Sequence, residues 1–145
     1  MIPELVDVGG PWKVLPPGVF EASLAEVEQR FATNERRKGL FAGLRAASEA
    51  LRRAGCACIY LDGSYVTEAT NPGDFDVCWE SQGVDPALLD PVFLDFDDRR
   101  KRQKQKYGGE FFPAAAMADG THRFIEFFQV DKATGQRKGI VKVQI

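Results

Sequence analysis

Two short motifs in the middle of the chain carry side chains suited to phosphate and metal chemistry. Gly63-Ser64 directly follows an apolar run, and Asp74-Phe75-Asp76 comes shortly after it. Glycine lets the backbone approach a phosphate closely, so backbone N–H groups and the Ser64 hydroxyl can bind its oxygens. Residues two apart on a strand share a face, so Asp74 and Asp76 would present neighbouring carboxylates. Such a pair repels unless a cation lies between them, and Mg²⁺ prefers hard oxygen ligands.

Two strands and the loop between them must position these motifs. Residues 56–62 (CACIYLD) are β-rich and too short for a helix, which predicts a buried strand that ends at Gly63. The Asn71-Pro72-Gly73 sequence is typical of a turn. Residues 75–79 then form a second strand, on which Phe75 and Val77 point into the core while the aspartates point the other way.

The other elements predict an α+β fold with a mixed sheet. Residues 1–19 form an irregular arm, packed on the body by Trp12, Val14 and Leu15, and residues 20–145 form a single domain. Asn34 is expected to cap the second helix, and Pro91 to interrupt the third. Arg36, Arg37 and Lys38 are expected on the solvent side of the second helix. Helices are predicted at 20–32, 34–54 and 86–106, and further strands at 109–114, 123–130 and 139–145.

The segment LDGSYVTEATNPGDFDV (residues 61–77) resembles the signature of the polymerase-beta-like nucleotidyltransferase superfamily. There, a strand ends in Gly-Ser, a spacer follows, and Asp-x-Asp lies on the next strand. The small size resembles the minimal nucleotidyltransferases of bacterial toxin–antitoxin and defence operons, and FIEFFQVDKATGQRKGIV resembles a bacterial group of the same fold. By pattern the resemblance covers residues 35–145. It implies a mixed sheet with helices packed on one side.

The resemblance also implies an activity. An NTP, expected to be ATP, would bind with Mg²⁺ or Mn²⁺ at Asp74 and Asp76, and its NMP would pass to a hydroxyl group. The acceptor would be a partner protein, such as a toxin, or an RNA end. The alternative is a protein of the same fold that is not catalytic and acts as an antitoxin or sensor by binding. A third hypothesis is a nucleic-acid-binding module that uses the basic stretch 99–106.

The family requires a third acid, on the next core strand, as a metal ligand or base. Glu110 lies on the first strand expected after the third helix, and Glu126 lies within the segment RFIEFFQ. Glu110 is the expected third acid, and Glu126 is the alternative. The family more often has aspartate at this position, and glutamate has a longer reach.

Three further residues are candidate nucleotide contacts. Tyr65 and Thr67 border the Gly-Ser motif, although Tyr65 could equally serve in packing. Arg102 would share one helical face with Arg99 and Lys106 and could bind a triphosphate or the acceptor. In the alternative interpretation, the basic stretch 99–106 only complements the dipole of its helix.

Composition excludes several other classes. The net charge of −2 disfavours a general polyanion binder, and 44% hydrophobic residues disfavour disorder. The three cysteines are expected in a reduced core, with too few further ligands for a zinc site. No apolar run could span a bilayer, and Met1-Ile2-Pro3-Glu4 lacks the pattern of a signal peptide. A cytoplasmic protein without membrane contact is therefore expected.

Overall fold

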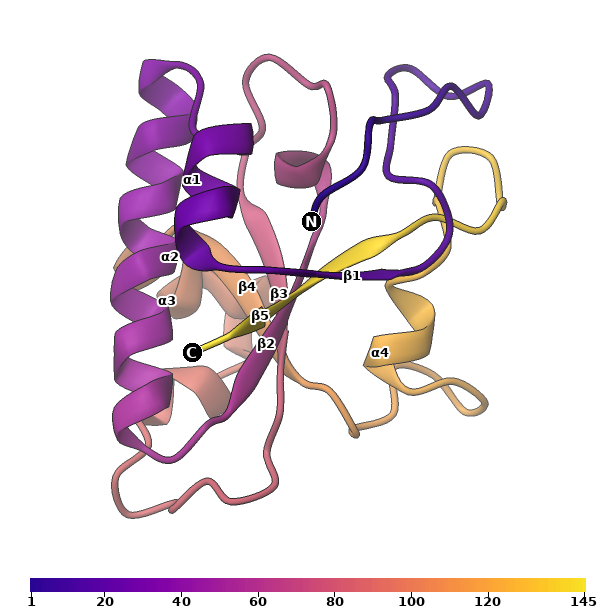
Figure 1. The fold of residues 1–145 in the computed structure, drawn as a ribbon. Coiled ribbons are helices and arrows are strands. Elements are labelled where there is room, and N and C mark those ends of the chain that lie inside the picture. Colours follow the sequence, from indigo (N-terminus) through magenta and orange to yellow (C-terminus); the bar gives the residue numbers. More distant parts are fainter.

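A five-stranded mixed sheet forms the centre of the protein in a computed structural model that describes residues 1–145 (Figure 1). The strand order is β1-β5-β2-β3-β4. Strand β2 runs antiparallel to both neighbours, β5 and β3, whereas the outer pairs β1–β5 and β3–β4 are parallel. The strands are β1 (Val19–Ala22), β2 (Cys58–Asp62), β3 (Phe75–Trp79), β4 (Gly109–Pro113) and β5 (Ile140–Gln144). The predicted α+β fold with a mixed sheet is confirmed.

Three helices cover one face of this sheet: α1 (Leu24–Phe31), α2 (Glu35–Arg53) and α3 (Asp97–Tyr107). The short helix α4 (Phe124–Phe127) lies on the opposite side (Figure 1). Side chains of successive residues along β3 point to opposite faces of the sheet. Phe75 and Val77 belong to the large core beneath the helices, while Cys78 packs with Phe112 and Phe128 in a smaller cluster on the other face. The larger core therefore lies between the sheet and helices α1 to α3, and the smaller cluster lies on the side of α4.

The first helix starts later than predicted, because residues 19–22 form strand β1 alongside β5. Ser23 caps α1: its hydroxyl accepts the Glu26 N–H at 3.1 Å, and the Glu26 carboxylate accepts the Ser23 N–H at 3.3 Å. This reciprocal Ser-x-x-Glu pair is a capping box, a start signal that was visible in the sequence. In the preceding arm, Val14 and Leu15 are buried as expected, but Trp12 is not.

The predicted helix at 86–106 is wrong in its first half. Pro91–Leu94 forms a short 3₁₀ helix, η2, and α3 begins only at Asp97. Within α3, Asp98, Arg99 and Arg100 have positive φ angles of 50°, 56° and 61°. The spacing of a regular right-handed helix therefore does not extend across Arg99, and the predicted common face of Arg99, Arg102 and Lys106 does not form.

The predicted strand at 123–130 is also wrong, because this segment contains helix α4. The two phenylalanines four residues apart, Phe124 and Phe128, both pack on Phe112, with ring centroids at 4.4 and 5.4 Å. Residues four apart share a face in a strand as well as in a helix, so this spacing is also compatible with the predicted strand. The predicted strands at 56–62, 75–79, 109–114 and 139–145 correspond to β2 to β5.

No helix has both the length and the apolarity required to cross a membrane.

Candidate functional site

The register of the sheet places acidic residues side by side on three neighbouring strands. Asp62 on β2 is the partner of Asp76 on β3, and Asp76 is the partner of Glu110 on β4. Directly paired residues point to the same face of a sheet, so these three side chains form one row. Asp74 precedes Asp76 by two positions and joins the row. The row lies on the face opposite α2, because the alternate residues Phe75 and Val77 face the helices.

Three members of this row are close enough to share one metal ion. One carboxylate oxygen from each of Asp74, Asp76 and Glu110 lies within 4.8 Å of the others. Oxygen ligands from carboxylates are what Mg²⁺ and Mn²⁺ take in proteins. Glu126 lies elsewhere, on α4, where its carboxylate accepts the Arg123 N–H at 3.1 Å. Of the two candidates for the third acid, the structure thus brings Glu110 to the aspartates and not Glu126.

The electrostatics of the cluster also suit a cation. Burial, followed by the negative charges of Asp74, Asp62 and Glu110, raises the pKa of Asp76 to about 7. Burial, followed by the charge of Glu110, raises the pKa of Asp74 as well. Carboxylates crowded in this way are poorly compensated when ionised. A divalent cation among them would remove the repulsion, so the residues present fit such an ion.

Basic residues from α3 contact the third acid. Arg100 Nε and Lys104 Nζ each lie 2.9 Å from a different oxygen of Glu110. Arg102, the residue predicted to bind phosphate, instead pairs with Asp95 at 2.7 Å, and its side chain is largely exposed. The prediction of Arg102 depended on regular helical spacing, which the left-handed residues of α3 interrupt.

A buried ion pair flanks the cluster on its other side. The Asp62 carboxylate accepts a hydrogen bond from Lys138 Nζ, and both side chains are almost fully buried. Burial raises the pKa of Asp62, and Lys138 opposes that rise. Neither residue was predicted for the site, because the residues are far apart in sequence. The only sequence signal was an aspartate at the end of a buried strand.

Replacing Lys138 by methionine should therefore destabilise the protein. We expect Lys138→Met to lower the free energy of unfolding by about 2 kcal/mol, since it leaves Asp62 buried without its partner. The loss should be larger at pH 8 than at pH 5, because the unpaired carboxyl has a further raised pKa and ionises only at a cost. Urea unfolding at both pH values measures this.

The double variant Asp62→Asn with Lys138→Met is the control, because it removes both charges. It should recover most of the loss and its pH dependence. If the single and double variants are equally unstable at both pH values, the ion pair does not determine the effect.

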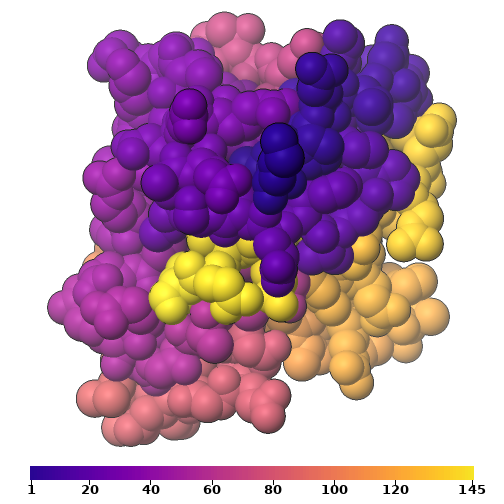
Figure 2. Space-filling model, viewed as in Figure 1, coloured from indigo at the N-terminus to yellow at the C-terminus, as the bar shows by residue number.

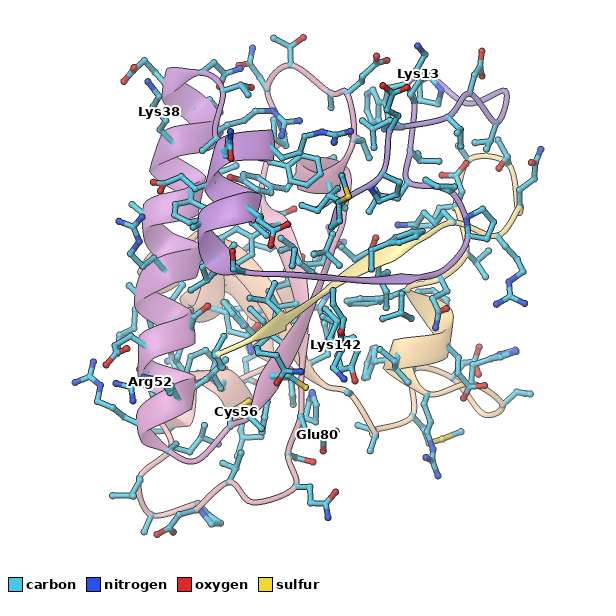
Figure 3. All side chains as sticks on the ribbon, in the orientation of Figure 1. Lys13, Lys38, Arg52, Cys56, Glu80 and Lys142 are labelled. Carbon is cyan, nitrogen blue, oxygen red and sulfur yellow. The ribbon has the colours of Figure 1, made fainter.

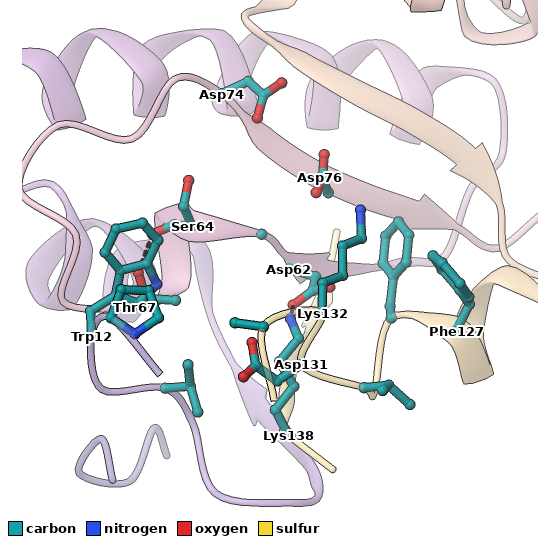
Figure 4. A pocket seen from close by; sticks show the side chains of 16 residues that line it. Trp12, Asp62, Ser64, Thr67, Asp74, Asp76, Phe127, Asp131, Lys132 and Lys138 are labelled. Carbon is teal, nitrogen blue, oxygen red and sulfur yellow. Dashed lines mark hydrogen bonds and ion pairs between the residues drawn. The ribbon is translucent and has the colours of Figure 1, made fainter. Parts of the chain in front are cut away.

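The Gly-Ser motif lies directly beside the acids. Gly63 has a φ of +88°, which disfavours side chains, and a Cβ at this position would lie 2.9 Å from Asp76 Oδ2. Ser64 begins the short 3₁₀ helix η1 (Ser64–Val66), and its carbonyl accepts the Thr67 hydroxyl at 2.6 Å. Ser64 and Thr67 both line the pocket that the aspartates line (Figure 4). Position 63 therefore requires glycine, because the end of β2 passes so close to Asp76 that a side chain would not fit.

The loop after this motif is held by Arg37 from α2. Its guanidinium donates to the carbonyls of Tyr65 at 2.6 Å, Thr67 at 2.9 Å and Ala69 at 3.1 Å. Arg37 is only 4% exposed, so its predicted place on the solvent side is wrong. Lys38, the next residue, does extend away from the body of the protein (Figure 3).

Two neighbours of Arg37 extend this contact along the loop. Asn34 Nδ2 donates to the Thr70 carbonyl at 2.8 Å, and Arg36 Nε donates to the Pro72 carbonyl at 3.0 Å. Arg36 also donates to the Gly73 carbonyl, directly before Asp74. The first turn of α2 thus fixes the whole connection between the Gly-Ser motif and the two aspartates.

Tyr65 belongs to the core and not to the pocket. Its side chain is fully buried, and its hydroxyl donates to the Arg37 carbonyl at 3.3 Å. The ring packs near Phe31 and Phe75, with centroids at 6.1 and 6.4 Å. Of the two interpretations of this residue, packing is the one that its position supports.

The three aspartates of the row and the Gly-Ser motif line a pocket of about 290 Å³ (Figure 4), whereas Glu110 lies outside its lining. Lys132 extends across it toward Asp76, whereas Trp12 lies on the side of Ser64 and Thr67. The remaining lining residues come from the N-terminal arm and from the segment around α4 and β5: Pro11, Val14, Phe127, Phe128, Val130, Asp131, Ala133 and Lys138. One face of the sheet therefore combines an acidic cluster, a glycine turn, a lysine that extends toward the acids, and apolar walls.

Comparison with known proteins gives a family and no function. Neither the curated proteins nor the solved structures include a significant match to this chain. One family model matches residues 11–144, which is nearly the whole chain and includes every residue of the site. The chain therefore belongs to the Family of unknown function (DUF6932).

Proposed function

We propose that this protein is a Mg²⁺- or Mn²⁺-dependent nucleotidyltransferase that transfers NMP, with AMP the expected group, from an NTP to a hydroxyl group. The observation that carries the proposal is that a carboxylate cluster lies beside a glycine turn, and that two of its aspartates line the same pocket as the turn. The carboxylates of Asp74, Asp76 and Glu110 lie within 4.8 Å of one another, and Gly63-Ser64 lies directly beside Asp76. Metal ligands and a phosphate-binding turn are the two parts that nucleotidyl transfer needs.

The residues divide the work by their chemistry. Asp74, Asp76 and Glu110 would hold the metal, which supplies charge neutralisation at the reacting phosphate when bound. The Gly63 backbone leaves room for a phosphate, and the Ser64 hydroxyl can donate to its oxygens. Lys132 extends toward the same acids and offers a cation to the triphosphate.

The acceptor oxygen forms a bond to the α-phosphorus of the NTP, and the bond from that phosphorus to the bridging oxygen breaks. Pyrophosphate leaves with that electron pair, and the acceptor's proton passes to a carboxylate, for which Glu110 is our candidate. We further propose that the acceptor hydroxyl belongs to a partner protein, such as a toxin, or to an RNA end, in the cytoplasm.

A direct test is to incubate the protein with each α-³²P-labelled NTP, Mg²⁺ or Mn²⁺, and cellular RNA or cell protein as acceptor. We expect label to enter an acceptor with equimolar release of pyrophosphate. Glu110→Gln should reduce both by about 10²-fold or more, as losing a group that stabilises the transition state does. Glu126→Gln is the matched control and should retain activity, because Glu126 lies outside the cluster. Release of orthophosphate without label transfer would contradict the proposal.

One observation favours a second candidate, nucleotide binding without turnover. Glu110 is engaged by both Arg100 and Lys104 at 2.9 Å, so the third acid is already well compensated. Under this alternative, NTP and metal bind, and the binding depends on Asp76, but no pyrophosphate is released with any acceptor. Calorimetric titration with NTP, run beside the pyrophosphate assay, distinguishes the two candidates.

A further inference from the structure

Three large apolar side chains that line the pocket are exposed. Trp12 is 42% exposed, Phe127 40% and Val130 41%, and all three line the same pocket as Asp74 and Asp76. Large apolar side chains left in water together commonly mark a binding site. The acidic and apolar parts are on different walls: the acids project from the sheet, while Trp12 comes from the N-terminal arm (Figure 4).

The arm holds Trp12 in place through anchored neighbours on both sides. The backbones of Val6 and Val14 exchange two hydrogen bonds, at 2.7 and 3.0 Å, which closes the arm into a loop. The Lys13 carbonyl accepts a hydrogen bond from the Glu68 N–H at 3.2 Å, which attaches this loop to the segment that follows Ser64. Trp12 therefore sits on a fixed backbone although its ring is half exposed.

A second attachment joins the arm to the opposite rim of the pocket. Gln136 Nε2 donates to the Val8 carbonyl at 3.0 Å, and Gly10 lies beside Asp131 and Thr134. The space-filling view shows the indigo N-terminal segment next to the yellow loop before β5 (Figure 2). The arm thus closes one side of the pocket, and Trp12 is its largest side chain there.

We infer that the Trp12 indole is the stacking platform for the nucleobase of the bound nucleotide. The inference rests on the proposed function, since it takes the phosphates to lie between Ser64 and the acids. The base of such a nucleotide lies one ribose away from the phosphates, and Trp12 is the aromatic side chain on the Ser64 side of the pocket (Figure 4). Indole faces stack on any base, so Trp12 provides affinity for a nucleoside without choosing among the four.

The chain has a built-in probe for this inference. It contains two tryptophans, and the other one, Trp79, is 3% exposed in the core. Titration with ATP and Mg²⁺ should quench the emission of Trp12, whereas inorganic tripolyphosphate with Mg²⁺ should bind without quenching because it has no base. Trp12→Phe should abolish the quenching signal and retain most of the affinity for ATP.

Affinity provides the second measurement. Trp12→Ala should weaken ATP binding by about 5- to 150-fold, the range for one base stacked on an aromatic side chain, and leave tripolyphosphate binding unchanged. Leu94→Ala, which trims an exposed apolar side chain outside the pocket, is the matched control and should alter neither affinity. Circular dichroism and thermal unfolding of each variant verify the fold.

The outcomes separate the two proposals. If ATP and tripolyphosphate both bind wild type and depend on Asp76, but Trp12→Ala weakens them equally or not at all, base stacking on Trp12 is wrong and the metal site stands. If neither ligand binds in the presence of Mg²⁺ or Mn²⁺, the proposed function fails, and the inference fails with it. A larger ATP loss in Trp12→Ala than in Trp12→Phe, with tripolyphosphate unaffected, supports the inference.

Discussion

Asp76→Asn should abolish metal binding and nucleotidyl transfer while making the metal-free protein more stable at pH 8. Asp76 stands between Asp62 and Glu110 in the sheet and next to Asp74, so every neighbour in the row adds negative charge. Without it, the two remaining acids of the cluster offer fewer oxygen ligands, and transfer should fall by about 10²-fold or more. An amide keeps the shape of the side chain and removes the charge.

The stability gain follows from the sign of the pKa shift. The pKa of Asp76 is about 7 in the fold, against about 4 for an unfolded chain. Between these values the folded protein binds the proton more tightly than the unfolded chain does, so the free energy of unfolding falls as the pH rises from about 4 to 7. Above pH 7, the ionisation of Asp76 lowers the free energy of unfolding by its full amount. The asparagine variant has no such ionisation and should exceed wild type by about 1–3 kcal/mol at pH 8 and differ little at pH 4.

Thermal unfolding with chelator at pH 4 and pH 8, followed by titration with Mg²⁺ or Mn²⁺, measures both effects. Wild type should gain stability from the metal at pH 8, and the variant should not. Glu126→Gln serves again as the control, since it removes a carboxylate that is outside the cluster. If the metal-free variant is less stable than wild type at pH 8, repulsion among the carboxylates does not destabilise the fold as proposed.

Local pattern was enough to predict the strands that carry the site. The runs that became β2 and β3 are short, apolar and bounded by turn residues, and a period of two puts Asp74 and Asp76 on one face. Strand β1 was missed because it is defined by its partner, β5, at the far end of the chain. Helix α4 was missed because Phe124 and Phe128 fit either a strand or a helix until their contact with Phe112 is known.

The same limit applied to the site. The expected strand order favoured Glu110 over Glu126 as the third acid, and the parallel pairing of β3 with β4 is what brings Glu110 to Asp76. The Asp62–Lys138 pair and the contacts of Glu110 with Arg100 and Lys104 join elements whose relative placement no local pattern encodes. Sequence reasoning could find the site residues that lie close together in the chain, and it could not find the partners that distant elements bring to them.

Arg37 is the residue for which local reasoning failed most, and its replacement should have the largest effect on stability. It sits among charged neighbours at the start of α2, a pattern typical of a solvent-facing side. In the fold, its guanidinium donates to the carbonyls of Tyr65, Thr67 and Ala69. These residues belong to the loop that follows Ser64 in the sequence. Arg37→Met fits the volume but leaves these buried acceptors without donors. We expect a loss of about 3–5 kcal/mol.

Three measurements test whether Arg37 holds the loop through the several N–H donors of its planar guanidinium. Arg37→Lys keeps the charge but cannot reach several carbonyls at once, so it should recover only a small part of the loss. Lys38→Met removes a neighbouring, exposed cation and should change stability by less than about 0.5 kcal/mol. Where Arg37→Lys still folds, its metal affinity should fall more than its stability alone requires, because the loop between Gly63 and Asp74 is no longer fixed at both ends. Full stability in Arg37→Lys would mean that charge, and not the geometry of the donors, is what the loop requires.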